Sequence, residues 1–293
     1  MHPNKKLLDV ASEIEAIIAP ISSLIQKHGK PVLMLSEFRS LLSKSIPKHI
    51  KFKTIENILE QSGIINRKIL KSDNYQDVKR ISISSLNPTP YHYAVSLRGE
   101  AYLSHSSAVH LLGLTQQQPK TIFVNKEQSK KPQAEGILSQ ESIDRAFSHP
   151  QRRSKYIFKI DGFQIVLLSG KATGRAGVID DRTTGLPITC LERTLIDITV
   201  RPRYAGGVFQ VSQAFKEAVN EINVSKLLSL LNTLNYRYPY HQALGFYLER
   251  AGANRDILNQ LREMGLHFNF YLDYSMANPS FDDSWRVFYP LGV

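Results

Sequence analysis

The sequence predicts an α+β protein: an N-terminal winged helix-turn-helix followed by a mixed α/β domain with a helical C-terminal end. Three observations predict this: helical periodicity up to about residue 61, two strand-like segments after it, and strands followed by helices beyond a linker with two prolines. The expected domains are 1–88 and 89–293. In the second, strands lie mainly in 120–170 and helices mainly in 186–265.

The N-terminal domain has the element order of a winged helix-turn-helix. Apolar residues recur at three- and four-residue steps in its first helix, which Pro20 should bend or split. A turn at Asp73-Asn74 joins its two strands. The expected helices cover 5–28, 35–42 and 54–61, and the expected strands cover 64–70 and 78–83.

The second domain is expected to form strands first and helices later. Asp161-Gly162 is a strong hairpin signal between two strand-like segments. Leucines at helical spacing dominate the C-terminal part. The expected strands are 121–125, 156–160 and 163–168, and the expected helices are 139–147, 189–199, 211–219, 224–234, 240–251 and 255–264.

The composition is that of a folded cytoplasmic protein. Hydrophobic residues make up 42% of the 293 residues and charged residues 22%, which excludes wholesale disorder. No apolar stretch is long enough to span a membrane, and the polar start does not fit a signal peptide. The single cysteine, Cys190, excludes an internal disulfide, so we expect a reducing cytoplasm.

Positive charge is concentrated in the first 160 residues. The chain carries a net charge of +11, of which +6 lies in residues 1–90 and +5 in residues 120–160. Residues 161–293 are neutral overall. Clustered cations favour a polyanionic partner, either nucleic acid or an anionic membrane, although a solubilising surface is the simpler alternative.

The winged helix provides the expected DNA-binding residues. The helix expected at 54–61 is the second of the helix-turn-helix pair, and its N-terminal end would enter the major groove. Asn57 near that end can pair with adenine. Lysines near that end and on the hairpin suit phosphate. The expected DNA-binding residues are Lys44, Lys48, Lys51, Lys53, Thr54, Asn57, Arg67, Lys68, Lys71, Lys79 and Arg80.

A second basic patch follows in the C-terminal domain. It can extend the DNA footprint, face an acidic partner, or belong to a solvated loop. Its members are Lys130, Lys131, Arg152, Arg153 and Lys155.

Signals for catalysis are poor, and we expect no enzyme activity, metal or cofactor. The segment 170–173 lacks two residues of a phosphate-binding loop: Ile165 stands where a glycine is required, and Ala172 where Ser or Thr is required. A nuclease remains the alternative, with four candidate residues whose spacing matches no metal site. These are Asp161, Lys171, Asp180 and Asp181.

Arg193 and Asp197 are four residues apart on an apolar helix. This spacing lets their side chains form an ion pair. Gly206-Gly207 then forms a turn before the next helix. Both features are interpreted as structural.

Four stretches resemble the AbiEi-type antitoxins, a family of bacterial transcriptional regulators. The third stretch is the most characteristic, with Glu192, Arg193 and Asp197 followed by the Gly206-Gly207 turn. The stretches are AYLSHSSAVHLLGL (101–114), PKTIFVN (119–125), LPITCLERTLIDITVRPRYAGG (186–207) and YPYHQALGFYLERAG (238–252).

The resemblance implies a specific role. Such antitoxins bind inverted repeats in their own promoter, repress a toxin–antitoxin operon, and neutralise a nucleotidyltransferase-like toxin, in phage defence among other settings. The implied partners are double-stranded promoter DNA and the toxin, with a homodimer on DNA and direct toxin binding left open. The implied location is the bacterial cytoplasm, with no membrane partner.

Overall fold

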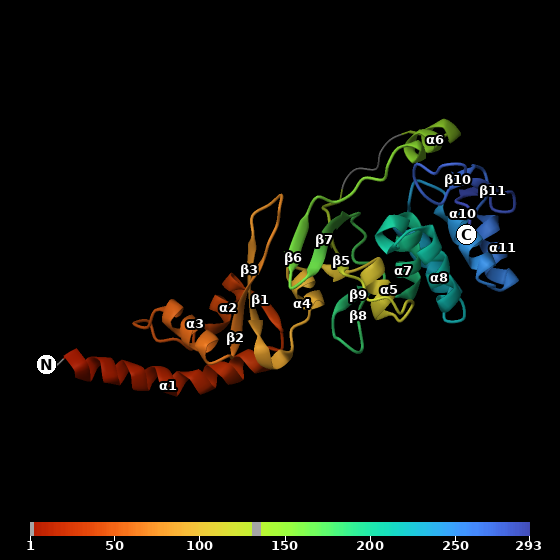
Figure 1. Cartoon of the computed structure of the whole chain (residues 1–293). Helices are drawn as coiled ribbons and strands as arrows, with labels where there is room; N and C mark the ends of the chain where they lie inside the picture. Colours follow the sequence, from red (N-terminus) through yellow and green to blue (C-terminus); the bar gives the residue numbers. More distant parts are fainter. Residues whose placement is uncertain (1–2, 131–135) are drawn as a thin grey trace.

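The N-terminal, central and C-terminal parts of the chain follow one another along the molecule, except that residues 140–148 lie beside the C-terminal part (Figure 1). The computed structural model describes residues 3–130 and 136–293, and in the first helix the side chains from residue 12 onward. The N-terminal helices and hairpin lie at one end, a central sheet follows, and a helical part with a small sheet closes the other end (Figure 1). The protein is mixed α and β, as the sequence predicts.

The N-terminal part encloses its own apolar core. Ile21 and Ile25 of the first helix pack on Leu33, Phe38 and other buried residues from the helices and strands that follow. The elements are α1 (Pro3–His28), β1 (Val32–Met34), α2 (Leu35–Leu42), α3 (Phe52–Gln61), β2 (Ile65–Leu70), β3 (Val78–Ile83) and the short 3-10 turn η1 (Ser84–Leu86).

These strands form an antiparallel sheet of order β1-β3-β2. The predicted helices and strands are present, whereas the three-residue β1 is too short to give a sequence signal. Pro20 does not split the first helix, because α1 continues through it. Pro20 is exposed, and Ile17, Ile21 and Ile25 on either side of it pack on the same core, which keeps the helix intact despite one missing hydrogen bond.

The central part is a mixed six-stranded sheet of order β6-β7-β5-β4-β9-β8. Strands β5 and β7 run parallel with Thr121 opposite Gln164, while β6 and β7 form the predicted hairpin around Asp161-Gly162. Its strands are β4 (Tyr102–Leu103), β5 (Thr121–Glu127), β6 (Ile157–Ile160), β7 (Phe163–Gly170), β8 (Val178–Asp180) and β9 (Pro187–Thr189). Its helices are α4 (Pro90–Val95) and α5 (Ser106–Leu111), whereas α6 (Gln140–Ser148) packs on the C-terminal part through Ile143 and Phe147 (Figure 1).

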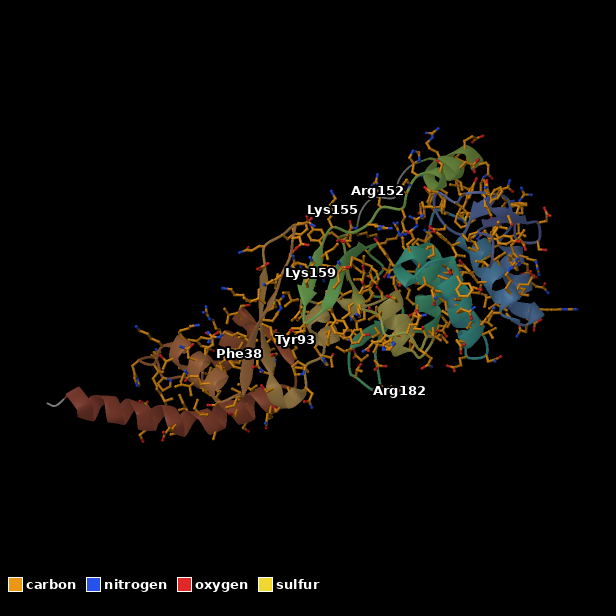
Figure 2. The ribbon with its side chains drawn as sticks, viewed as in Figure 1. Phe38, Tyr93, Arg152, Lys155, Lys159 and Arg182 are labelled. Carbon is orange, nitrogen blue, oxygen red and sulfur yellow. The ribbon has the colours of Figure 1, made fainter. Side chains whose placement is uncertain are left out.

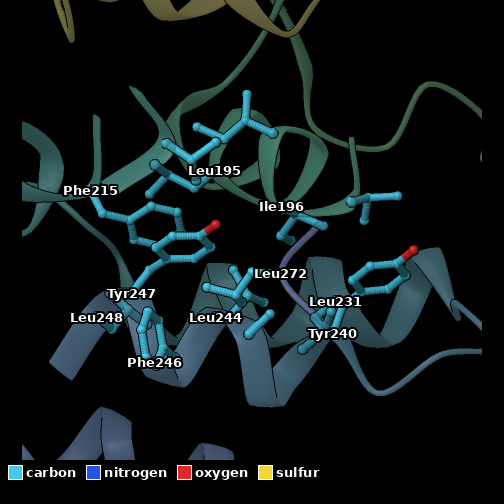
Figure 3. Packing of buried hydrophobic residues seen from close by; sticks show 14 of the residues in the cluster. Leu195, Ile196, Phe215, Leu231, Tyr240, Leu244, Phe246, Tyr247, Leu248 and Leu272 are labelled. Atoms are coloured by element: carbon cyan, nitrogen blue, oxygen red, sulfur yellow. The ribbon is translucent and has the colours of Figure 1, made fainter. Parts of the chain in front are cut away.

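The C-terminal part packs its helices around the largest apolar cluster. Figure 3 shows Leu195 and Ile196 of α7 above Tyr240, Leu244 and other residues of α10. The elements are α7 (Leu191–Val200), η2 (Pro202–Ala205), α8 (Val208–Ala218), α9 (Val224–Leu234), α10 (Tyr240–Arg250), α11 (Arg255–Glu263), β10 (Phe270–Tyr271), β11 (Ser280–Asp282) and β12 (Val287–Tyr289).

The predicted helices 189–264 are present with small shifts at their ends. The small sheet β10-β12-β11 is not predicted from the sequence because its strands have only two or three residues. Among the described residues, no helix has both the length and the apolar composition needed to cross a membrane.

Candidate functional site

The connection between α2 and α3 presents a group of exposed cations, here named the α3 surface. The start of α3 lies in it: Lys51 precedes the helix without a side-chain hydrogen bond to the first backbone N–H groups. Free N–H groups at a helix start and nearby lysines together suit a phosphate. The α3 surface consists of the exposed residues Lys44, Lys48, Lys51, Lys53 and Thr54.

Asn57 is half-buried and already engaged within the protein. Its Oδ1 accepts a hydrogen bond of 3.1 Å from Nη2 of Arg67, and Arg67 is also paired with Glu60. That ion pair lowers the pKa of Glu60. Bidentate recognition of adenine uses both atoms of the amide, so Arg67 would have to release Asn57 first. The guanidinium of Arg67 is itself directed to α3.

Arg80 is wrongly predicted as a DNA-binding residue. It is only 6% exposed, and its guanidinium donates to the backbone oxygen of Ser96 from Nε at 3.2 Å and from Nη2 at 2.7 Å. Burial lowers its pKa to about 10. Arg80 therefore fastens β3 to the end of α4 and cannot reach a duplex.

The β2–β3 hairpin is docked on the central sheet. Lys71 and Lys159 exchange two backbone hydrogen bonds of 3.0 and 2.7 Å, and Nζ of Lys68 lies 3.0 Å from Asp161. Lys159 in turn pairs with Asp73 at the hairpin tip. Lys68 is thus occupied by a partner within the protein, whereas Lys71 and Lys79 keep exposed side chains.

A large basic cleft lies between β5, the segment before β6, the loop after β7, and α7. Its volume is about 1550 Å³. It brings Lys130, Arg152, Arg153 and Lys155 of the second basic patch together, while Lys131 lies outside the described residues. Figure 2 places Arg152 and Lys155 on the segment that leads into β6. The cleft also contains Ser104, His105, Asn125, Lys171, Arg193, Asp197, Arg201, Tyr204 and Tyr236.

Arg193 and Asp197 form the predicted ion pair at the inner wall of this cleft. Nε of Arg193 donates to Oδ1 of Asp197 at 2.8 Å, and Nη1 donates to the backbone oxygen of Ala176 at 2.7 Å. Their side chains are 5% and 7% exposed. Burial opposes the charge on Arg193, but Asp197 outweighs it and the pKa of Arg193 is raised.

The other residues of this motif also hold the C-terminal helices together. The buried carboxylate of Glu192 lies 2.8 Å from Nζ of Lys226 and accepts from the backbone N–H of Asn223, which joins α7 to the start of α9. Gly206 and Gly207 have φ angles of 93° and 100°. Residues with side chains rarely adopt these angles, so glycine permits the turn between η2 and α8.

The loop after β7 is held by hydrogen bonds to side chains of β5. Glu127 accepts from the backbone N–H groups of Thr173 at 2.9 Å and Arg175 at 3.2 Å, and Asn125 accepts from that of Gly170. The ammonium of Lys171 donates to the backbone oxygens of residues 234 and 235 at the end of α9. This wall of the cleft is therefore preformed.

His105 lies at the bottom of the cleft in a strained conformation. Its φ is 51°, its ring is buried, and its Nδ1 lies 2.9 Å from Oγ of Ser104. Burial, assisted by the cations Arg201 and Arg193, lowers its pKa to about 3. His105 is therefore neutral at physiological pH and adds a polar, uncharged side chain to the lining of the cleft.

The four candidate nuclease residues do not converge. Asp161 pairs with Lys68, Asp181 accepts from Thr184, and Lys171 faces backbone oxygens of α9. Within residues 3–130 and 136–293, no three His, Cys, Asp or Glu side chains gather as metal ligands.

The sequence gives no local signal for the cleft as a whole. Its lining comes from segments that are more than a hundred residues apart, from Tyr75 to Tyr236. The clustered cations of residues 120–160 indicate one wall, but the contribution of Arg201 and Tyr236 depends on how α7 and α9 pack against the sheet.

The comparisons with known proteins reach the fold only. No protein-family profile and no curated protein matches this sequence. Among solved structures, the chain is similar to the RV2827C protein from Mycobacterium tuberculosis, with a TM-score of 0.56 and 13% sequence identity. The similarity covers 93% of this chain and 91% of that one. At this identity, the two chains share an overall fold, and nothing about function follows.

Proposed function

We propose that this protein is a DNA-binding antitoxin of the AbiEi type. It binds inverted repeats in its own promoter through an N-terminal winged helix-turn-helix, represses its operon, and neutralises a nucleotidyltransferase-like toxin. Two copies on inverted repeats would form a homodimer on DNA. The setting is the bacterial cytoplasm, in agreement with a single, buried, reduced cysteine, Cys190.

One observation carries the DNA-binding half of the proposal. The element order α1-β1-α2-α3-β2-β3, with sheet order β1-β3-β2, is typical of winged helices, and its α3 surface is exposed and basic. In such a module the second helix of the pair enters the major groove with its N-terminal end. Lys51 and Lys53 stand at that end of α3, which suits phosphates on either side of the groove.

The test is a binding experiment with the promoter duplex at several salt concentrations. The variant Lys51→Gln/Lys53→Gln is compared with Lys216→Gln/Arg182→Gln, which removes two exposed cations far from the α3 surface. Each lost phosphate contact lowers the salt slope by about 0.9, so the first variant should lose nearly two units. The control should bind like the wild type. Equal behaviour of the two variants would reject the α3 surface as the interface.

The antitoxin half is tested separately, by rescue of growth from the toxin encoded beside the gene. We expect Lys51→Gln/Lys53→Gln to lose repression yet still rescue growth, because the substitutions lie outside the C-terminal domain. Loss of rescue at unchanged protein level and thermal stability would make DNA binding part of neutralisation. A neighbouring gene product without toxicity would overturn the antitoxin proposal.

A further inference from the structure

We propose that the basic cleft binds a single-stranded segment of nucleic acid. This proposal is independent of the α3 surface and of duplex binding there. It rests on three properties of the cleft: an excess of cations, exposed aromatic rings among them, and a volume larger than a small ligand needs.

The charge of the cleft is strongly positive. Among the residues that the structure describes, seven cations line it against a single carboxylate, that of Asp197, which Arg193 already neutralises. The cations are Lys130, Arg152, Arg153, Lys155, Lys171, Arg193 and Arg201. Across the described residues, Arg152, Arg153 and Lys155 enter no ion pair, which distinguishes them from Lys68 and Lys159 nearby. A row of unpaired cations along a concave wall suits successive phosphates.

Aromatic rings are placed at the mouth of the cleft and inside it. Tyr156 stacks on Tyr75 of the hairpin tip, with ring centroids 4.3 Å apart, and both rings remain about 40% exposed. Tyr204 and Tyr236 line the interior. Aromatic faces between cations are the surfaces on which unpaired bases stack in single-strand-binding proteins.

The size of the cleft favours a strand over a free nucleotide or a duplex. Pockets for small ligands have volumes of about 300–1,000 Å³, and this cleft, at about 1550 Å³, exceeds that range. Bases reach rings inside a cleft only when they are unpaired, because in a duplex they are stacked and covered by the backbone. The loop after β7, which forms one wall, is held by Glu127 and Asn125, so this wall needs little ordering on binding.

The test measures fluorescence anisotropy of labelled single-stranded oligonucleotides of about eight nucleotides, as DNA and as RNA, with the full chain. We expect binding, and a loss of about tenfold or more in Arg153→Gln/Lys155→Gln, while Arg182→Gln binds like the wild type. Arg182 is an exposed arginine in the β8–β9 turn, away from the cleft (Figure 2). Tyr156→Ala should weaken binding about tenfold, whereas Tyr156→Phe, which keeps the ring, should not.

Competition separates the cleft from the α3 surface. The Lys51→Gln/Lys53→Gln variant should lose duplex binding and keep the single strand. Absence of single-strand binding, unchanged affinity in the cleft variants at unchanged thermal stability, or equally good competition by a duplex would overturn the proposal. Equally good competition by a nucleoside triphosphate would also overturn it, since the ligand would then be a nucleotide.

Discussion

The cations of the two basic regions differ in whether other groups of the protein bind them. Around β2 and β3, most of the cations are used within the protein: Arg67 binds Glu60, Lys68 binds Asp161, and Arg80 is buried against Ser96. In the segment before β6, Arg152 and Lys155 lie exposed along a cleft without such partners in the described part of the chain. The net charges of +6 in residues 1–90 and +5 in residues 120–160 do not predict this difference.

The difference shows what charge counting misses. A cation is less available to a polyanion when a carboxylate or a backbone oxygen holds it at short distance or when it is buried. On the hairpin, Glu60 and Asp161 supply such partners to Arg67 and Lys68, and the Lys68–Asp161 pair helps to dock β2 on the central sheet. In the cleft, the exposed charges share the lining with the buried Arg193–Asp197 ion pair, which we interpret as structural. Three perturbations test this division, and each acts on a different type of charged group.

The largest effect is expected from Arg193→Ala. The substitution leaves the carboxylate of Asp197 buried without its partner, and removing one member of a buried pair costs about 3–5 kcal/mol. We expect a clear fall in melting temperature and a parallel loss of toxin rescue through lost folded protein. Thermal unfolding followed by circular dichroism provides the measurement.

The double variant Arg193→Ala/Asp197→Ala is the matched control. Because it removes both charges, it should unfold at a higher temperature than Arg193→Ala alone. If Arg193→Ala keeps the wild-type melting temperature but fails to rescue, Arg193 acts at the functional site and the structural interpretation is wrong.

An intermediate effect is expected on acidification, at the loop that forms one wall of the cleft. Partial burial opposes the charge on Glu127, but hydrogen bonds from Thr173 and Arg175 outweigh it, so its pKa lies below the ordinary 4.5. Such a carboxylate stabilises the fold above pH 4.5, and the stabilisation is lost as the pH falls through the lowered pKa.

Amide hydrogen exchange at Thr173 and Arg175 measures this loosening. Their protection, corrected for intrinsic exchange, should fall as the pH drops below 4.5, and Glu127→Gln should abolish this dependence. Protection that stays constant to low pH in the wild type would mean that Glu127 does not hold the loop.

Much of the fold could be predicted because its elements are long and periodic. The helix α9 begins and ends at the predicted residues, Val224 and Leu234, and the Asp161-Gly162 turn fixes the β6–β7 hairpin. The Arg193–Asp197 pair follows from helical spacing alone. Short strands such as β1 and β10 carry too few residues for any pattern, and contacts with distant segments decide whether they form.

The candidate sites could be predicted less well, because burial and pairing depend on tertiary contacts. Arg80 looks like its neighbour Lys79 in the sequence, yet β3 turns it inward toward Ser96. The position of Asp161 beside Lys68 joins residues that are 93 positions apart. No local spacing reports such a contact, and none reports that Tyr236 and Arg152 line the same cleft.

The smallest effect is expected at the surface contact between the hairpin and the central sheet. Lys68 and Asp161 are 38% and 55% exposed, so solvent screens their attraction, and such pairs contribute about 0–1 kcal/mol. Lys68→Ala and Asp161→Ala should each shift the melting temperature by at most a few degrees, and a double-mutant cycle should give a coupling below about 1 kcal/mol. Because Lys68 is held by Asp161, its loss should change duplex affinity less than the loss of Lys51 does. If Lys68→Ala weakens promoter binding as strongly as Lys51→Gln, then Lys68 leaves Asp161 when the protein binds DNA. The cations of the hairpin would then be available to bind phosphate.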